Sequence, residues 1–349
     1  MYSSEYTSRG GPSLATLVRL DPTNGRVLAR SHRLSNFGGF AVIGGEVWAI
    51  SGAGDSGIHG ASTVNLVGFG LLSLRQNQLL PLTLGPGGPP DGSTYGPIAV
   101  PSGPHAPGGP GGAGRPGAAG RPGAAGRPGV AGGKAWAMFG CDLVQVDLGT
   151  GRIAHSISVA AQPWCGASFT IGGGSLYVAG PQEPDGSLRL ERRSVSSGKL
   201  TAVGSIPSAP VAVSLAVSGQ YIWAAGGDPG ANGFAYVFST SSLKLVAQSR
   251  SPDGNSRRPG GAGTHNLPLF GQFPSVDVSG PAPTVWVGSD GEAACFGARS
   301  AKLGSIGIPE PDLVTGDVVV TSQGTFGVDN WAGGGIVKIQ APPGCGASR

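Results

Sequence analysis

Charged residues and long apolar runs are scarce in this sequence, and each shortage excludes a class of protein. Only 12% of the 349 residues are charged, and the formal net charge is +4. The Lys and Arg residues form no cluster with interleaved aromatics, which argues against nucleic-acid binding. No segment reaches the roughly 18 apolar residues that a membrane-spanning helix needs. The N-terminal segment MYSSEYTSRGG has no apolar stretch, so it is not a signal peptide.

Motifs that mark common catalytic and metal sites are also missing. The five histidines are scattered without an HExxH pairing, and there is neither a GxSxG elbow nor a Walker loop. None of the four cysteines belongs to a CxxC pair, which disfavours a zinc site. We therefore expect no metal and no cofactor. The adjacent arginines Arg192 and Arg193 are expected to be solvated loop or edge charges.

Glycine and proline, by contrast, are abundant, with 66 and 30 residues. Because 39% of the residues are hydrophobic, the chain is too apolar to be wholly disordered. Its glycine content is too high for a helical protein. Glycine and proline favour turns, so the composition predicts an all-β fold of many short strands joined by tight turns.

Two kinds of β-hairpin alternate along the chain. The first is an apolar strand, a small turn and a strand with an aromatic residue. It occurs at Phe40–Ile50, Phe169–Ala179 and Leu215–Ala225, and more loosely at Val276–Gly288 and Asp312–Ser322. The second has an Asp/Ser/Thr/Gly turn. Its copies are Leu17–Arg30, Gly70–Leu84, Leu143–Ser156, Leu188–Val203, Ala235–Gln248 and Ala294–Ile306.

One hairpin of each kind makes four strands, and the pair recurs at roughly 40 to 60 residues, which is typical of a β-propeller. We expect a single β-propeller over residues 1–349. These five hairpins of the first kind and a sixth, which the collagen-like run described below interrupts, predict six blades, and an additional upstream hairpin would make seven. The N-terminal hairpin and the C-terminal strand GGIVKIQAP are expected to complete one blade together.

Aromatic residues recur at one position of the second strand. They are Trp48, Trp136, Tyr177, Trp223 and Trp286, and the last unit has Val319 there. Side chains fixed to a repeat in this way predict core packing between blades, whereas a ligand-binding stripe is the alternative.

The turns LDPTNGRV and VDLGTGRI and the GGEVWA hairpin resemble quinoprotein-like, YVTN and NHL-type propellers. The resemblance covers nearly the whole chain except Pro101–Gly133. Propellers of this style are common in actinobacteria as secreted or lipid-anchored proteins. The resemblance therefore implies an extracellular or cell-surface protein if an export signal precedes this chain, and a cytoplasmic one otherwise.

A collagen-like run of Gly, Pro, Ala and Arg interrupts the second unit. Joining GPIAV (Gly96–Val100) to GGKAWAMFG (Gly132–Gly140) restores a hairpin of the first kind. The run between them, residues 101–133, is predicted to be a disordered loop in that hairpin, because closing a longer loop costs little. The alternative, a triple helix, needs three chains, whereas we expect a monomer.

The loops that join second and third strands should gather at one face, where propellers bind ligands. They are Ser51–Asn65, Gly180–Gly186, Gly226–Gly233, Ser289–Ala293 and Gly324–Gly335, and the loops between blades at the same face include Ala161–Gly166 and Arg250–Phe273. The candidate ligand-binding residues are Trp164, Trp331, Asp55, Asp228 and Asp290; Glu183, Asp185, Glu292 and Asp329 are further acidic residues at that face. Exposed tryptophans are frequent binding anchors. The alternative is that the tryptophans plug the channel and that Asp serves only the turns.

An even number of cysteines suits two disulfides in an oxidising compartment. From the expected positions of the strands we predict the pairs Cys141–Cys165 and Cys295–Cys345, although spacing alone does not determine connectivity.

The predicted function is a noncatalytic binding or scaffold propeller. Its partner would be a small molecule, peptide or protein at one face. The alternative is a propeller enzyme, either a quinoprotein-like oxidoreductase or a streptogramin-lyase-like protein, and a His and Asp/Glu cluster at one mouth of the channel would identify it.

Overall fold

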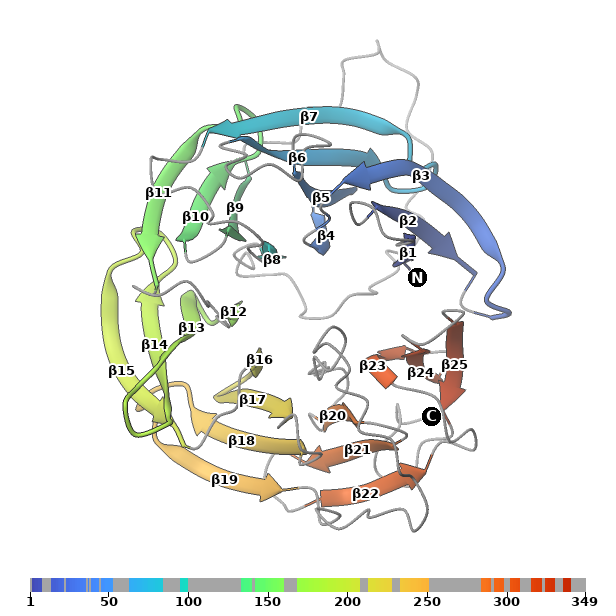
Figure 1. Cartoon of the computed structure of the whole chain (residues 1–349). Coiled ribbons are helices and arrows are strands. Elements are labelled where there is room, and N and C mark those ends of the chain that lie inside the picture. The colour runs from blue at the N-terminus through green and yellow to red at the C-terminus, as the bar shows by residue number, and fades with distance from the viewer. Residues whose placement is uncertain are drawn as a thin grey trace, which may run out of the picture. The chain divides into compact units, whose positions relative to one another are not determined.

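The structure is a computed structural model, and its described residues form strands and turns without a helix. They are 2–7, 14–21, 23–35, 37, 39–43, 45–52, 63–83, 95–99, 133–139, 142–159, 168–207, 213–227, 233–250, 284–289, 292–297, 302–307, 315–321, 324–329 and 335–339. The chain divides into two compact units, Met1–Cys165 and Gly166–Arg349. Each unit is built from antiparallel sheets whose strands follow one another in sequence (Figure 1).

The first unit holds three sheets. The sheet β1-β2-β3 comprises Tyr2–Thr7, Leu14–Leu20 and Val27–Ser35. The sheet β4-β5-β6-β7 comprises Gly39–Ile43, Glu46–Gly52, Thr63–Gly70 and Gln76–Thr83. The sheet β8-β9-β10-β11 comprises Tyr95–Ala99, Lys134–Phe139, Asp142–Asp147 and Ile153–Ser158. The first strands β4 and β8 lie beside each other.

The second unit holds four sheets. Two have four strands: β12 to β15 are Ser168–Gly172, Ser175–Gln182, Leu188–Ser194 and Leu200–Ile206, and β16 to β19 are Val213–Ser218, Tyr221–Gly227, Gly233–Ser239 and Leu245–Arg250. Two have three described strands: β20 to β22 are Thr284–Ser289, Glu292–Gly297 and Lys302–Gly307, and β23 to β25 are Thr315–Thr321, Gly324–Asp329 and Gly335–Ile339. Here β12 lies beside β16, and β20 beside β23.

The two ends of the chain differ from the prediction. Strand β2 pairs with β1 on one side and with β3 on the other, so no strand from the C-terminus can take the place of β1, and the C-terminal strand β25 belongs to the sheet of β23 and β24. The polar sequence YSSEYT of β1 lacks the apolar pattern that predicts a strand. The prediction that the two termini complete one blade together was therefore wrong, while the number of blades stays a prediction.

The prediction of a hairpin at Asp312–Ser322 was also wrong. Residues Thr315–Thr321 form one strand, and Gly324–Asp329, expected as loop, form the next. The Thr-Gly pair that predicted a turn is accommodated as a register shift between Thr315 and Val318 opposite β24. A β-branched run such as VVVT favours a continuous strand, because these side chains pack well on a pleated sheet.

The strands that flank the collagen-like run pair as expected. Strand β8 pairs antiparallel with β9, with Ile98 opposite Ala137 and Ala99 opposite Trp136. Residues 101–132 lie outside the described part of the chain, so their predicted disorder stays a prediction. The hairpin on both sides of them is nevertheless present.

The hydrophobic core lies between consecutive sheets. In β5, Val47 and Ala49 belong to a cluster shared with Leu17 of β2. Trp48 and Ile50, which point to the opposite face, belong to a cluster shared with β9 and β10. Alternate residues of a strand point to opposite faces, so β5 contributes to two cores at once. A third cluster joins the sheets β12–β15 and β16–β19.

The predicted core role of the repeated aromatics is confirmed for four of them. Trp48, Trp136, Tyr177 and Trp223 are all buried. Trp286 lies in β20 and Val319 in β23, but their side chains are outside the described part of the structure.

Five turns between the last two strands of a sheet share one backbone geometry. In each, the amide of the fifth residue donates to the carbonyl oxygen of the first, as Gly151 does to Asp147 at 2.8 Å and Leu243 to Ser239 at 2.9 Å. The fifth residue has positive φ, which favours glycine. Gly25, Gly151 and Gly198 occupy it in three turns, but Leu74 and Leu243 occupy it in the other two.

The two leucines are buried against the preceding sheet. Leu243 packs over Gly204 of β15, where an added Cβ would lie 2.9 Å from the leucine Cβ. At the turn of Gly151 the arrangement is reversed, because Leu80 of β7 in the preceding sheet fills the space beside this glycine. The junctions at Leu243 and at Gly151 therefore each combine one large residue with one small one.

Candidate functional site

The predicted ligand-binding residues lie outside the described part of the chain. This holds for Trp164, Trp331, Asp55, Asp228 and Asp290, and for Cys141, Cys165 and Cys345. Cys295 lies in β21, but its side chain is not described. Their predicted roles and both disulfides stay predictions. Of the five loops expected at the binding face, the one between β13 and β14 is fully described, and the candidate site is built there.

The sequence Glu183-Pro184-Asp185-Gly186 forms the tight turn between β13 and β14. The amide of Gly186 donates to the Glu183 carbonyl oxygen at 2.9 Å, and the amide of Glu183 donates to the Ser187 carbonyl oxygen at 2.7 Å. Proline sets φ for the second turn position, and Gly186 supplies a φ of +83° that other residues rarely adopt. The turn is therefore held in one conformation by its own sequence.

The Asp185 carboxylate forms two hydrogen bonds with Ser187, the residue that follows the turn. Its Oδ1 atom accepts hydrogen bonds from the Ser187 amide at 2.9 Å and from the Ser187 hydroxyl at 2.7 Å. Both bonds favour the charged form, and the hydroxyl bond is the main reason that the pKa of Asp185 lies below its usual value. The carboxylate is thus ionised over the whole physiological pH range.

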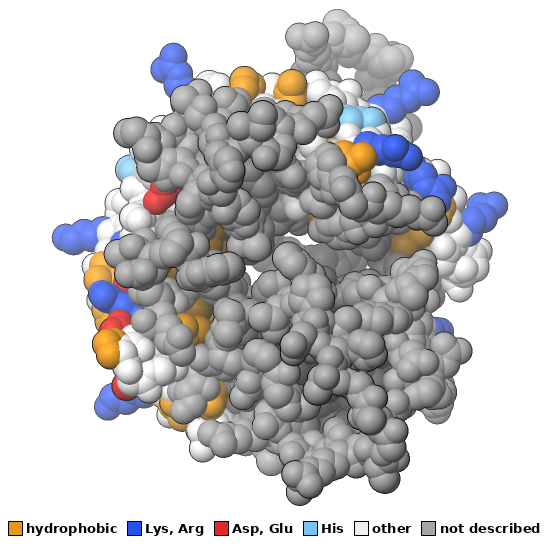
Figure 2. Space-filling model, in the orientation of Figure 1, with side chains coloured by type: hydrophobic (Ala, Val, Ile, Leu, Met, Phe, Trp, Pro, Cys, Tyr) orange, Lys and Arg blue, Asp and Glu red, His pale blue; other side chains and the backbone are white. Residues whose placement is uncertain are grey.

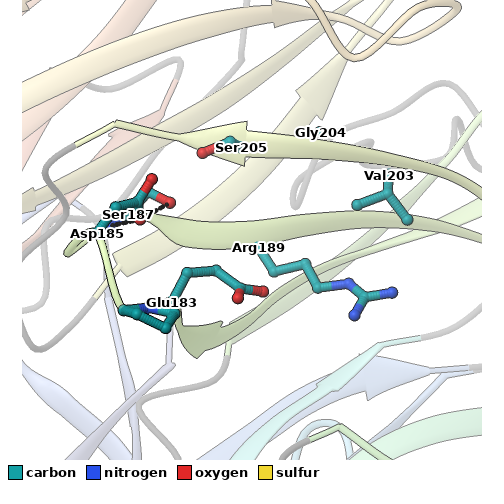
Figure 3. Close-up of a pocket in the computed structure, with 8 residues that line it drawn as sticks. Glu183, Asp185, Ser187, Arg189, Val203, Gly204 and Ser205 are labelled. Carbon is teal, nitrogen blue, oxygen red and sulfur yellow. Dashed lines mark hydrogen bonds between the residues drawn. The ribbon is translucent and has the colours of Figure 1, made fainter.

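An open pocket of about 520 Å³ lies beside this turn on the outer part of the sheet (Figure 3). It is lined by Glu183, Pro184, Asp185, Ser187, Arg189, Val203, Gly204 and Ser205. The turn supplies the two carboxylates, β14 supplies the guanidinium group, and β15 supplies the remaining wall. Acidic, basic, hydroxyl and apolar groups therefore meet in one depression.

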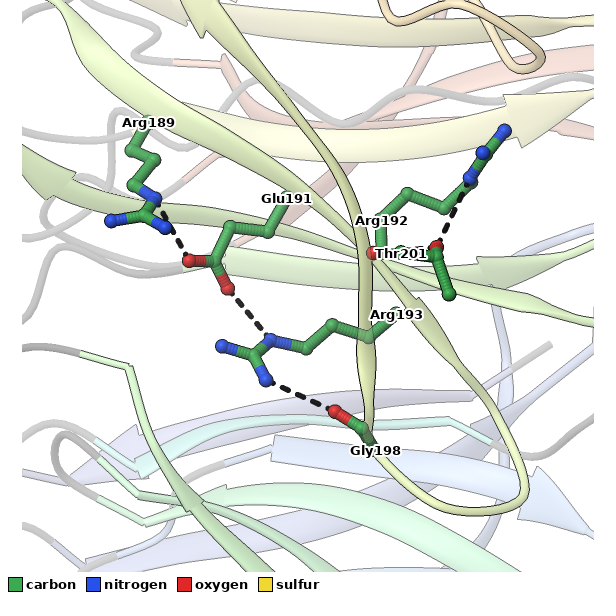
Figure 4. A network of polar contacts seen from close by, with 6 residues as sticks. All are labelled: Arg189, Glu191, Arg192, Arg193, Gly198 and Thr201. Carbon is green, nitrogen blue, oxygen red and sulfur yellow. Dashed lines mark hydrogen bonds and ion pairs between the residues drawn. The ribbon is translucent and has the colours of Figure 1, made fainter.

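The guanidinium group of Arg189 belongs to a network of ion pairs with Glu191 and Arg193 (Figure 4). Its Nε atom is buried and lies 3.0 Å from Oε1 of Glu191, as an ion pair whose geometry is not that of a hydrogen bond. The Glu191 side chain is only 8% exposed, and its Oε2 atom accepts a hydrogen bond from Nε of Arg193 at 2.7 Å. Arg193 in turn donates to the Gly198 carbonyl oxygen at 3.0 Å. A buried carboxylate is stable here because two arginines share it.

The expectation that Arg192 and Arg193 are solvated edge charges was wrong. Arg193 is 14% exposed and belongs to the charge network. Arg192 points to the other face of β14 and donates to the carbonyl oxygens of Thr240 and Ser241, at 2.9 and 2.8 Å. Strand alternation in the sequence LRLERR separates these two arginines, and it is the signal that a count of charges misses.

Other charges lie elsewhere on the surface. In Figure 2 several of the visible Lys and Arg side chains lie near one another at the upper right edge, and others stand apart along the left edge. Within the described residues, no group of three or more His, Cys, Asp or Glu side chains is placed to hold a metal ion. Nor do those residues include a helix long and apolar enough to cross a bilayer.

Comparisons with known proteins identify the fold alone. No family model matches the chain, and no curated protein matches it. Among solved structures, the Dos1 propeller resembles it with a TM-score of 0.55 and 8% sequence identity, over 93% of this chain and 72% of that one. The all-β sheets together with this likeness show a β-propeller fold, as the repeats predicted.

Proposed function

We propose that the protein is a noncatalytic binding propeller that takes up a ligand in the pocket beside the β13–β14 turn. The observation that carries this proposal is the guanidinium group of Arg189, which forms an ion pair with the buried Glu191 at the edge of an open pocket. Binding sites keep their polar groups in place through a supporting layer of hydrogen bonds and ion pairs, which lowers the cost of ordering on binding.

The position of the pocket also supports the proposal. It lies at a loop between a second and a third strand, and propellers present ligands on such loops in the families that this sequence resembles. The turns LDPTNGRV and VDLGTGRI, which carry that resemblance, both close with a glycine of positive φ, Gly25 and Gly151. Assignment to the quinoprotein-like, YVTN or NHL type is part of this proposal.

A fragment screen tests the proposal. Small polar compounds would be screened by ligand-observed NMR against the wild-type protein and against the double variant Glu183→Gln/Arg189→Gln. We expect binders that lose affinity in the double variant. The matched control is Glu46→Gln/Arg152→Gln, which makes the same chemical changes away from the pocket, in β5 and in the turn between β10 and β11, and should leave binding unchanged. Binders whose affinity is the same for the wild type and for both double variants would contradict the assignment of this pocket.

We also propose an extracytoplasmic location, supported by the even number of cysteines and by the resemblance to secreted propellers. The test is thiol counting on protein purified from its native cells under alkylating conditions. Two disulfides are expected, and four free thiols would refute this part of the proposal.

A further inference from the structure

We infer that the pocket recognises a zwitterionic ligand, one that carries a carboxylate and an ammonium group on a short backbone, as a small peptide does. The inference rests on the proposed function, because it names the ligand class of the same pocket. It follows from the opposite charges at two ends of the pocket and from the way in which each is held.

The positive end is Arg189. Its Nε atom is buried against Glu191, while 38% of the whole side chain is exposed. The accessible surface therefore belongs to the other atoms of the side chain, and Figure 4 shows one terminal nitrogen directed away from Glu191 and the other on the side of Glu191. An outward guanidinium nitrogen carries N–H donors and positive charge, which suit a carboxylate.

The charge balance of the network leaves Arg189 able to bind an anion. Glu191 carries one negative charge and contacts two arginines, Arg189 and Arg193. The three groups together therefore have a net positive charge. An additional carboxylate at Arg189 would neutralise that charge.

The negative end is the turn. The Glu183 carboxylate is exposed and, among the described side chains, forms no ion pair with Arg189 although both line the pocket. Figure 3 shows the Glu183 carboxylate beside the aliphatic part of Arg189, with the guanidinium group farther along the pocket. Asp185 adds a second carboxylate, kept ionised by Ser187. An ammonium group is the natural counterion for such a pair.

The wall between the two ends suits an extended backbone. Val203 and Ser205 of β15 project on the same face as Arg189, because Arg189 lies opposite Ser205 in the β14–β15 register. Val203 is half exposed and offers an apolar surface, and Ser205 offers a hydroxyl group. Pockets of several hundred Å³ take ligands larger than a single ion. The two carboxylates would repel a purely anionic ligand, and Arg189 would repel a purely cationic one.

Triglycine and its two capped forms provide the test. Triglycine carries both charges, N-acetyltriglycine lacks the ammonium group, and triglycine amide lacks the carboxylate. Each would be titrated into the full-length protein at pH 7 and low salt, with binding followed by NMR. We expect triglycine to bind about tenfold or more tightly than either capped form, as the loss of a charged hydrogen-bonding pair implies.

Variants then assign the two ends. Arg189→Gln should remove the advantage of triglycine over triglycine amide, and Glu183→Gln should reduce its advantage over N-acetyltriglycine. Arg189→Lys keeps the charge and loses the planar guanidinium group, so it should retain part of the binding. Arg152→Gln and Glu46→Gln are the matched controls. Thermal melting of every variant checks that each one is folded.

Two results would overturn the inference. One is equal binding of the three peptides by the wild-type protein. The other is no binding of any of them at millimolar concentrations. If fragments from the screen described above still depend on Glu183 and Arg189, the ligand class is wrong and the binding pocket stands. If no fragment depends on them either, the proposed function fails as well.

Discussion

Gly172 in β12 lies against Val217 in β16 more closely than any side chain on Gly172 would allow. A methyl group on Gly172 would lie 2.5 Å from Cγ1 and 2.8 Å from Cβ of Val217. The two strands belong to consecutive sheets, so the glycine sets how closely these sheets approach.

Gly172→Ala should therefore destabilise the protein. Neither Val217 atom is at the flexible end of a long side chain, so the strands must separate. Overpacking of this kind costs about 1–3 kcal/mol, measurable by urea denaturation. The double variant Gly172→Ala/Val217→Ala removes the nearer of the two contacts and should recover part of the loss. A fully stable single variant would mean that the sheets are farther apart than described.

Leu243→Gly should also destabilise, although it removes a residue with an unfavourable φ of 55°. Relief of the left-handed conformation is worth about 1–2 kcal/mol. Loss of the buried leucine costs about 2–5 kcal/mol, so the net change should be a loss of about 1–3 kcal/mol in the free energy of unfolding. Leu72→Gly, at an exposed position of an equivalent turn, is the control and should cost less. A stabilised Leu243→Gly protein would show that strain outweighs packing.

Arg192→Ala should weaken the contact between the sheets β12–β15 and β16–β19. The substitution removes hydrogen bonds to the carbonyl oxygens of Thr240 and Ser241, and we expect a loss of about 1–3 kcal/mol. Lys199→Ala, at an exposed turn position, should change the free energy of unfolding little. Equal effects of the two substitutions would argue that the Arg192 bonds contribute nothing.

Asp185 predicts a pH dependence of definite sign. Its pKa is lowered in the folded protein, so its contribution to stability is present above the unfolded-state pKa and is lost as the pH falls through the folded value. Asp185→Asn keeps an acceptor for Ser187 but cannot titrate. The variant should thus lose less stability than wild type between pH 5 and pH 2, a range chosen to bracket the ordinary aspartate pKa. Parallel acid profiles would contradict this expectation, as would an NMR titration of wild-type Asp185 with an unshifted midpoint.

Replacing residues 101–133 with two glycines should leave the fold intact. Strands β8 and β9 already pair on both sides of this segment, and shortening a loop changes closure entropy only logarithmically. We expect a melting temperature within a few degrees of wild type by circular dichroism, because about 1 kcal/mol corresponds to only a few degrees in a chain of this size. A much larger loss would show that the segment packs on the sheets.

Much of the fold could be predicted because its signals are local and repeated. The hairpins around Trp48, Tyr177 and Trp223 combine apolar alternation with glycine turns, and the structure contains them. Strand β1 was missed because its residues are mostly polar, and it is held by pairing with β2 rather than by its own pattern. Strand β24 was missed because its glycines suggested a loop.

The candidate site was only partly predictable. Loop position identified Glu183 and Asp185, since turn residues can be read directly from EPDG. Arg189 was not predicted, because its role depends on the burial of Glu191 beside Arg193. That burial arises from tertiary packing on one face of β14, which no short motif records.

The matched large and small residues at the turns have a consequence for how such chains can be rearranged. If the turn of Leu243 followed β7, two leucines, Leu243 and Leu80, would compete for the space of one. If the turn of Gly151 followed β15, Gly151 and Gly204 would leave a void. Sheets of nearly the same architecture are thus not exchangeable, because the residues at each junction between consecutive sheets fit only the native order of those sheets. A shuffled or circularly duplicated version of this chain should misassemble unless these pairs are moved together.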